Sequence, residues 1–337
     1  MLRTLLAVAA ALAPAPAWAA WKMLPFPKDD VTLRAVAVVS AGRFQVSGSK
    51  GTYAVTEDGG GAWRLATPPG GEALDFRGVA ALDDRTAVLM SAGDGPAGQA
   101  KLFRTDDAGR TWSLAFETRL PGSFLDTIAF RDAGDGFVLG DPIDGRWFLL
   151  RTRDGGKTWA PIEGPPVQPG EAAFAASNSA LFLGGRSDIW IVSGGLARGR
   201  VHRSKDEGRT WAVAQSPLPA SQTAGLFGGL ALAAGRAVVV GGDYKDELAA
   251  GPSIAVGAGD AWTLAPHVGT PRLLEGVGRL DAKTLIAVGP RGTSVSADGG
   301  KTWRQVDQEA FHAIACRAGV CVAAGGKGRV GMWTPEP

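Results

Sequence analysis

Short apolar runs separated by turn-forming residues dominate the chain from end to end. One stretch is representative, with runs at 127–130, 136–139, 146–152 and 158–162 that are bounded by Gly and Asp. Runs of this length that are rich in Val, Ile, Phe and Thr are typical of strands. The pattern predicts an all-β protein built from many short strands.

A turn motif separates these runs at regular intervals. Its pattern, Ser/Thr-x-Asp-x-Gly-x-Thr-Trp, occurs at 105–112, 152–159, 204–211 and 296–303, and at 56–63 with Ala62 in place of Thr. The Asp carboxylate can accept bonds from backbone N–H groups, the Gly can take a positive φ, and the Trp opens the next strand. Five copies of one turn predict a repeat architecture, and a structural role for the motif rather than a catalytic one. The residues given this role are Asp58, Asp107, Asp154, Asp206, Asp298, Trp63, Trp112, Trp159, Trp211 and Trp303.

The spacing of the motif gives the length of one blade of a β-propeller. Its tryptophans are 41 to 52 residues apart when a degenerate copy at 257–262 is included, which leaves room for four strands per repeat. The C-terminal runs 312–316, 320–324 and 329–333 supply three strands of a further blade, and the N-terminal run 21–26 resembles the missing fourth. We predict a seven-bladed propeller of four-stranded blades, the last completed by the N-terminal strand, with six or eight blades as alternatives.

The first residues read as an export signal. Arg3 supplies a positive charge, an apolar run follows at 5–12, and Ala17-Trp18-Ala19 forms a small-x-small cleavage site. We therefore expect a signal peptide at 1–19, a single propeller domain at 20–337, and a mature protein that is periplasmic or secreted.

Charge and motif composition narrow the range of partners. The 35 Lys and Arg residues nearly balance the 33 Asp and Glu residues, for a net charge of +2, which argues against nucleic acid or an anionic membrane as the main partner. The three histidines have no zinc-ligand spacing, and no glycine-rich phosphate loop opens a helix. Asp243, Asp246 and Glu247 could hold calcium, but a solvated loop is the simpler interpretation. We expect no metal and no cofactor.

Loops on one face of the propeller depart most from the repeat. The connections between second and third strands, and those between blades, share the face on which the central channel opens, and residues 164–178 insert an extra segment there. Decorated loops on one face are the expected place for function, although ordinary drift in loop length is the alternative. The candidate binding residues are Asp141, Arg146, Glu171, Asn178, Asp243, Tyr244, Lys245, Arg272, Arg291 and His312.

The only two cysteines, Cys316 and Cys321, flank a short turn. A hairpin at this point would place them opposite each other on adjacent strands. Export to an oxidising compartment favours a disulfide, and a buried thiol pair is the alternative.

The repeated turn resembles the Asp-box, or bacterial neuraminidase repeat, of known propeller families. Together with the segment FLDTIAFRDAGDGFVLGDPIDGRWFLLRTRDGGKTW, it makes the chain similar to secreted propellers of the photosystem II stability/assembly factor-like family. That resemblance implies a non-enzymatic assembly factor that binds a membrane-protein intermediate. We accordingly expect a monomeric binding module that engages an envelope or membrane-associated protein, or a small polar ligand or glycan.

Sialidases use Asp-box propellers too, so a glycoside hydrolase of sialidase-like type is the alternative function. Such enzymes use a tyrosine nucleophile, a glutamate partner and an arginine cluster. Tyr244 is expected at the channel mouth near Glu247, Arg272 and Arg291, whereas Tyr53 is expected away from the channel. The Phe/Tyr-Arg-Ile-Pro motif of sialidases is absent from the sequence, so the binding module is favoured over the enzyme. A purely structural protein is a third alternative.

Overall fold

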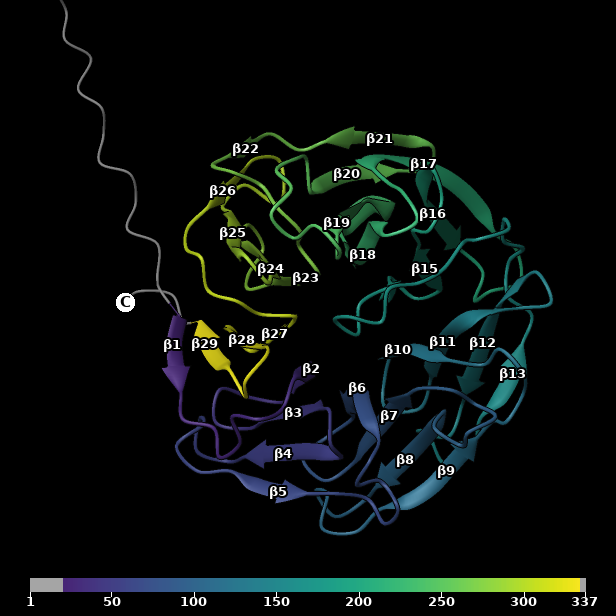
Figure 1. Cartoon of the computed structure of the whole chain (residues 1–337), viewed down its shortest axis with the longest axis vertical. Coiled ribbons are helices and arrows are strands. Elements are labelled where there is room, and N and C mark those ends of the chain that lie inside the picture. The colour runs from purple at the N-terminus through teal and green to yellow at the C-terminus, as the bar shows by residue number, and fades with distance from the viewer. Residues whose placement is uncertain (1–20, 334–337) are drawn as a thin grey trace, which may run out of the picture.

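The computed structural model describes residues 21–333 of the chain. The predicted signal peptide at 1–19 therefore lies outside the described residues. In this described part, twenty-nine strands form seven sheets that are arranged as the blades of a ring around a central channel (Figure 1). The prediction of a seven-bladed, all-β propeller is confirmed, and the alternatives of six or eight blades are wrong.

Each blade begins with the strand nearest the ring axis, and we number the blades along the chain (Figure 1). The first three are regular four-stranded antiparallel sheets. Blade 1 consists of β2 (Leu33–Val38), β3 (Phe44–Gly48), β4 (Thr52–Thr56) and β5 (Arg64–Ala66). Blade 2 consists of β6 (Asp75–Ala81), β7 (Ala87–Ala92), β8 (Lys101–Thr105) and β9 (Ser113–Glu117). Blade 3 consists of β10 (Leu125–Phe130), β11 (Gly136–Ile143), β12 (Arg146–Thr152) and β13 (Ala160–Ile162).

The remaining blades include one short helix and one additional strand. Blade 4 consists of β14 (Leu181–Gly184), β15 (Asp188–Val192), β16 (Arg198–Ser204) and β17 (Ala212–Pro219). Blade 5 consists of β18 (Ala224–Ala231), the 3₁₀ helix η1 (Ala233–Gly235), β19 (Ala237–Asp243), β20 (Ile254–Ala258) and β21 (Ala261–Leu264). Blade 6 consists of β23 (Gly276–Arg279), β24 (Leu285–Gly289), β25 (Gly292–Ser296) and β26 (Trp303–Gln305), with β22 (His267–Val268) parallel to β26. Blade 7 consists of β27 (Ala313–Arg317), β28 (Val320–Ala324), β29 (Val330–Trp333) and β1 (Trp21–Leu24).

The N-terminal strand closes the ring as predicted. β1 pairs antiparallel with β29, with Trp21 opposite Trp333, at the outer edge of blade 7 (Figure 1). The Trp21 ring packs against Phe311 and Trp333, and its Nε1–H donates to Thr293 Oγ1 of blade 6 at 2.9 Å. Because β1 covers the edge of β29, the last blade presents no long unpaired strand.

The repeated turns share one set of hydrogen bonds, which the copy around Asp154 illustrates. Asp154 Oδ1 accepts from the Thr158 backbone N–H at 3.0 Å, and Oδ2 accepts from the Thr158 hydroxyl at 2.7 Å. These bonds hold the pKa of Asp154 at about 2. Gly156 has a φ of 80° and donates its N–H to Thr152 Oγ1 at 2.9 Å. The turn is thus closed by its own side chains, as the motif requires.

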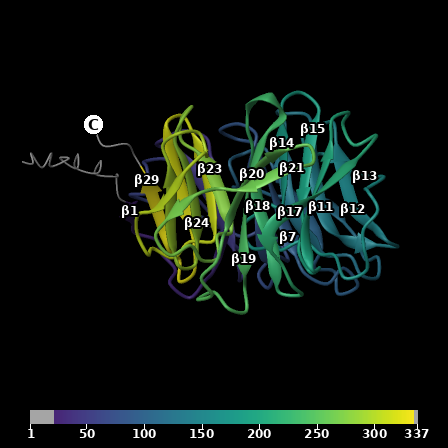
Figure 2. The same ribbon diagram turned by 90° about the horizontal axis from the view of Figure 1, so that it is seen from above.

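Each of these turns is bonded to the first hairpin of its own blade. Gly155 N–H donates to Gly134 O, and Gly299 N–H donates to Lys283 O in the same way. The repeated turns and the hairpins between first and second strands therefore lie on the same face of the ring. Because strands run from face to face (Figure 2), the loops between second and third strands and the connections between blades must lie on the opposite face, which we call the mouth face.

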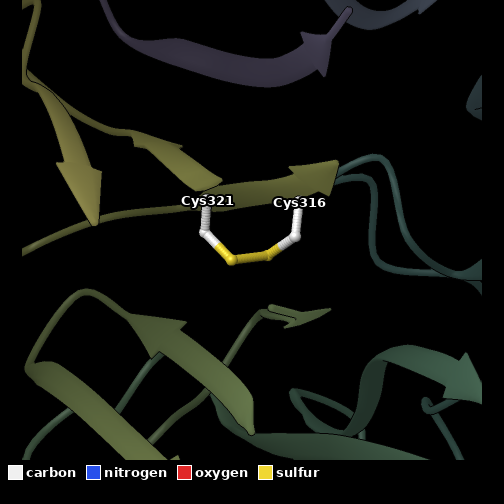
Figure 3. Close-up of a disulfide and its surroundings, with 2 residues drawn as sticks. All are labelled: Cys316 and Cys321. Atoms are coloured by element: carbon white, nitrogen blue, oxygen red, sulfur yellow. A yellow bond between two sulfur atoms is a disulfide. The ribbon is translucent and has the colours of Figure 1, made fainter. Parts of the chain in front are cut away.

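The two cysteines lie opposite each other in the register of β27 and β28 and are joined by a disulfide (Figure 3). The predicted limits of other strands shift slightly. β1 ends at Leu24 rather than at 26, β13 begins at Ala160 rather than at 158, and β11 continues to Ile143. The extension of β11 brings its last residues to the mouth face.

Candidate binding site at the channel mouth

A cavity of about 420 Å³ occupies the channel at the mouth face. Half of its lining comes from the first part of the innermost strands or from the residues just before them. Six blades each contribute one residue at equivalent places, namely Arg34, Arg77, Asp126, Phe227, Glu275 and His312, and Phe124 precedes β10. The innermost strands of blades that are far apart in sequence surround the centre of the ring (Figure 1), and their side chains therefore line one cavity.

A β-bulge explains how four of these side chains reach the channel. In β2, β6, β10 and β18 the pairing with the next strand shifts by one residue, between Leu33 and Ala35 in β2 and at the equivalent places in the other three strands. A bulge leaves one residue without a partner in the ladder and redirects its side chain. The extra residues are Arg34, Arg77, Asp126 and Phe227.

Two carboxylates form one wall of the cavity. Asp126 on β10 is only 1% exposed, and Asp141 on β11 is partly buried beside it. Within residues 21–333, Asp126 Oδ2 and Asp141 Oδ1 are buried without a hydrogen-bond partner. Burial raises the pKa of Asp126 well above its usual range, and the neighbouring Asp141 raises it further, while Arg77 opposes the rise. Burial also raises the pKa of Asp141 to about 6, although the Ala173 backbone N–H lowers it in part.

Positive charge lines the adjacent wall, but most of it is paired. Arg77 Nε donates to Asp75 Oδ2 at 2.8 Å, and one of its terminal nitrogens donates to Ala175 O at 3.2 Å. His312 Nδ1 lies 2.6 Å from Glu275 Oε2. Burial lowers the pKa of Arg34, and the charge of Glu275 opposes this.

The insert between blades 3 and 4 extends into the channel, where the teal segment before β14 reaches the centre of the ring (Figure 1). Residues Ala173–Ala176 line the cavity. The Phe174 ring packs against Phe227 with centroids 4.5 Å apart and against Tyr244 with centroids 5.6 Å apart. Ser177 Oγ donates to Glu275 O at 2.7 Å. The insert is therefore hydrogen-bonded to blade 6 and packed against blade 5.

Glu171 anchors the base of the insert. Its side chain is buried, with only 4% of the residue exposed. The carboxylate accepts from Ser193 Oγ at 2.7 Å and from the Gln168 backbone N–H at 3.0 Å. It also lies 2.7 Å from His202 Nε2 and forms an ion pair with Arg200. Burial alone would raise the pKa of Glu171, but these bonds, His202 first, hold it at about 2. Glu171 therefore fixes the loop in place and is not available to a ligand.

The structure divides the ten predicted binding residues into three groups. Asp141, Tyr244 and His312 line the central cavity. Glu171 and Asn178 hold the insert in place instead of facing a ligand, which corrects the prediction for these two residues. Glu171 makes the bonds described above, and Asn178 Oδ1 accepts from the Ile128 backbone N–H at 2.8 Å. The other five lie outside the lining of the central cavity, either at the mouth-face ends of β12 and β19 (Arg146 and Asp243) or on loops (Lys245, Arg272 and Arg291).

The surrounding loops carry ion pairs and a second, basic hollow. Arg146 pairs with Glu163 at 3.0 Å, and Arg291 pairs with Glu247 at 3.2 Å. Arg272 and Arg291 line a cavity of about 380 Å³ together with Arg329. The Lys245 ammonium lies 5.7 Å from the Tyr244 ring centroid.

Sequence reasoning missed most of the cavity lining, yet the sequence contains a signal for it. Each of the six channel residues follows an apolar residue and precedes a small one, as in Leu33-Arg34-Ala35, Leu125-Asp126-Thr127 and Leu274-Glu275-Gly276. A charge inside an apolar run at the same place in several repeats points to a common axis. Of the six, only His312 is among the predicted binding residues.

Three of the nine exposed large apolar side chains between residues 21 and 333 lie on mouth-face loops. Six belong to the outermost strands of the blades, namely Met23, Leu65, Leu114, Val213, Leu264 and Val268. The other three, Leu120, Tyr244 and Leu248, lie on the connection between blades 2 and 3 or on the loop after β19. Tyr244 also lines the central cavity, and an exposed aromatic side chain beside a polar cavity suits a protein-binding surface.

Within the described part of the chain, no group of three or more His, Cys, Asp or Glu side chains is placed to hold a metal ion. No helix between residues 21 and 333 is long and apolar enough to cross a membrane.

Comparison with solved structures shows the fold. The chain is similar to YCF48 bound to a D1 peptide, with a TM-score of 0.69 and 18% identity over 98% of this chain and 100% of that one. It is similar to YCF48 from Cyanidioschyzon merolae, with a TM-score of 0.67 and 15% identity over 95% and 100% of the two chains. It also resembles U3-55K, with a TM-score of 0.65 and 11% identity over 94% and 98%. No protein-family model matches the chain, and no curated protein matches it significantly.

Proposed function

We propose that this protein is an exported, non-enzymatic binding module that engages a protein of the cell envelope, or one associated with the membrane, through its mouth face. The observation that carries the proposal is the central cavity, where charged and aromatic side chains from six blades converge without contributing to the repeat. A fold that needed only to close its ring would have no use for buried carboxylates without partners.

The comparison with YCF48 supports a protein partner. That propeller, which matches this chain over nearly its whole length, has been solved with a D1 peptide bound. The resemblance of the repeated turns and of the 124–159 segment to photosystem II stability/assembly factor-like propellers supports the same class of role. The signal-like residues 1–19 support export to the periplasm or the medium.

The mouth face has the composition of a protein contact surface. Tyr244 and Leu248 are 43% and 59% exposed on the loop after β19, and paired charges surround them. An aromatic anchor beside a pocket with a polar rim is the usual arrangement of a binding hot spot. We expect Tyr244 to contribute most to partner affinity.

Photo-crosslinking tests this proposal. A benzophenone amino acid at Leu248 should crosslink to a specific envelope protein when the full-length protein is expressed in its host. The matched control places the same group at Leu114, which is 52% exposed on the outermost strand of blade 2. Adducts at both positions or at neither would contradict binding through the mouth face.

The glycoside hydrolase alternative has weaker support. Its mechanism needs Tyr244 activated by a carboxylate within hydrogen-bond reach. Within the described residues no hydrogen bond joins Tyr244 to Glu247, which pairs instead with Arg291. Release of a fluorophore from an aryl sialoside by the purified protein, abolished by Tyr244→Phe, would favour the enzyme.

A further inference from the structure

We propose that the central cavity is a receptor for a single cationic side chain, lysine or arginine, of the protein partner, with Asp126 and Asp141 as the carboxylates that receive it. This inference rests on the proposed function, because the cation belongs to a segment of the partner that enters the mouth. It names the chemistry by which that partner is recognised.

Several charged side chains in the cavity already have partners. Arg77 is paired with Asp75, His312 with Glu275, and Glu247 with Arg291. Arg34 lies where the charge of Glu275 acts on it, but its buried Nε has no hydrogen-bond partner within residues 21–333. Asp126 Oδ2 and Asp141 Oδ1, which line the same cavity, also lack a partner there. Two carboxylates without a partner therefore stand against one such cation.

Burial makes this surplus unusual. A polar group that is removed from water without a hydrogen bond costs free energy, and a carboxylate costs more than an amide or hydroxyl. Asp126 is 1% exposed, and the bulge in β10 directs it into the cavity instead of toward a neighbouring strand. A donor that arrives with the partner would satisfy oxygens that the chain itself leaves unbonded.

The shape and the remaining walls suit a long cationic side chain. The cavity of about 420 Å³ lies within the roughly 300–1,000 Å³ range of ligand pockets and is far larger than one water molecule. Phe124, Phe174 and Tyr244 line it along with the carboxylates. Aromatic faces attract ammonium and guanidinium groups, and they cover the aliphatic stem of a lysine or arginine.

Other ligands fit the site less well. An anionic group would meet both Asp126 and Asp141, and Arg34 alone would attract it, because Arg77 already has Asp75 as its partner. A metal ion would find only two carboxylates that are not already paired, since Glu247 and Glu275 have Arg291 and His312 as partners, and the described residues contain no group of three potential ligands. A neutral side chain would leave both carboxylates without a counter-charge.

Proton release gives the proposal a distinct signature. Asp126 and Asp141 hold protons more tightly than ordinary carboxyls, so a cation that binds between them must displace a proton. Affinity should therefore rise between pH 5 and pH 7.5. The other charged groups that face the pair are Arg34, Arg77 with Asp75, Glu247, and Glu275 with His312.

Small probes test this without the partner. N-acetyl-arginine methylamide and N-acetyl-lysine methylamide would be titrated into the ¹⁵N-labelled mature protein and followed by NMR, with the citrulline and glutamate analogues as neutral and anionic controls. We expect the cationic probes to bind at least tenfold more tightly than the citrulline probe at pH 7.5, and about tenfold more weakly at pH 5. Equal binding of the citrulline probe, or tighter binding of the glutamate probe, would overturn the proposal.

Two isosteric variants locate the site. Asp126→Asn and Asp141→Asn should each weaken the cationic probes by tenfold or more, whereas Asp84→Asn, an exposed carboxylate on the opposite face, should leave them unchanged. Melting curves report whether each variant is folded. Undiminished probe binding in both cavity variants would place the cation elsewhere.

The crosslinking experiment separates this inference from the proposed function. If Leu248 crosslinks a partner but the cationic probes do not bind, the binding module stands and the receptor for a cation is wrong. If the probes bind and no partner is crosslinked, the cavity chemistry stands and the proposed role in protein binding fails. If both are correct, Asp126→Asn should reduce the yield of the Leu248 adduct.

Discussion

Replacing Asp141 with asparagine should make this protein more stable at neutral pH, which is the opposite of what most substitutions do. The carboxylate is partly buried, and its Oδ1 lacks a hydrogen-bond partner within residues 21–333. Asparagine has nearly the same shape, and its carbonyl oxygen can still accept from the Ala173 backbone N–H. The substitution therefore removes a buried charge and keeps the contacts.

The size and sign of the effect follow from the pKa of Asp141. Burial raises it from 3.8 to about 6, so between these pH values the folded protein binds more protons than the unfolded chain. Ionisation of Asp141 therefore lowers the free energy of unfolding. The cost is absent below about pH 4, grows as the pH rises toward 6 and levels off above it. Because each pH unit between 3.8 and about 6 is worth about 1.4 kcal/mol, the ionised Asp141 destabilises the folded state by at most about 3 kcal/mol at pH 8.

Urea unfolding of the native protein, Asp141→Asn and Asp84→Asn at pH 8 and pH 4 measures this directly. We expect Asp141→Asn to gain about 1–3 kcal/mol at pH 8, or a few degrees in Tm, and to gain little at pH 4. The exposed control should match the native protein at both pH values. A loss of stability at pH 8, or the same gain at both pH values, would show that Asp141 is not an unpartnered buried charge.

Three further predictions concern the fold. Deleting residues 20–27 removes β1 and exposes the edge of β29, so the truncated protein should aggregate on heating and melt several degrees lower; an unchanged Tm would mean that β1 does not close the ring. Thr158→Ala removes the 2.7 Å bond to Asp154 and should cost about 1 kcal/mol in urea unfolding, a modest loss because the blade 1 turn already has Ala62 there. Reducing the Cys316–Cys321 disulfide should cost about 2 kcal/mol or less because the loop is short, and two alkylated thiols without reductant would refute the bridge.

The sequence was sufficient to predict the ring because the repeat is local. A turn such as the one around Asp154 is closed by residues four positions apart, so its chemistry can be read directly from the motif. The closure by β1 was predictable for a related reason, since the C-terminal repeat lacks a fourth strand and the N-terminal run resembles one.

The site could be predicted only in part, because it depends on contacts between distant segments. Tyr244 and Asp141 were found because they lie on loops that depart from the repeat. Asp126 was missed because it lies inside an apolar strand, where a bulge turns its side chain toward the channel. Glu171 was misjudged because its partners, His202 and Arg200, lie in the next blade, and nothing in the local sequence marks it as buried.

The six channel residues separate what the fold requires from what a function requires. Arg34, Arg77, Asp126, Phe227, Glu275 and His312 occupy equivalent places in their blades. The neighbours of each are constrained in the same way, since an apolar residue precedes it and a small one follows. The residue itself is basic, acidic or aromatic, so the backbone at this place demands only a side chain that can point into the channel. A ring selected for stability alone would fill such positions with apolar or mutually paired groups. Asp126 is neither apolar nor paired with a cation. The simplest reason to retain a buried carboxylate that weakens the fold is that a group outside the chain binds to it.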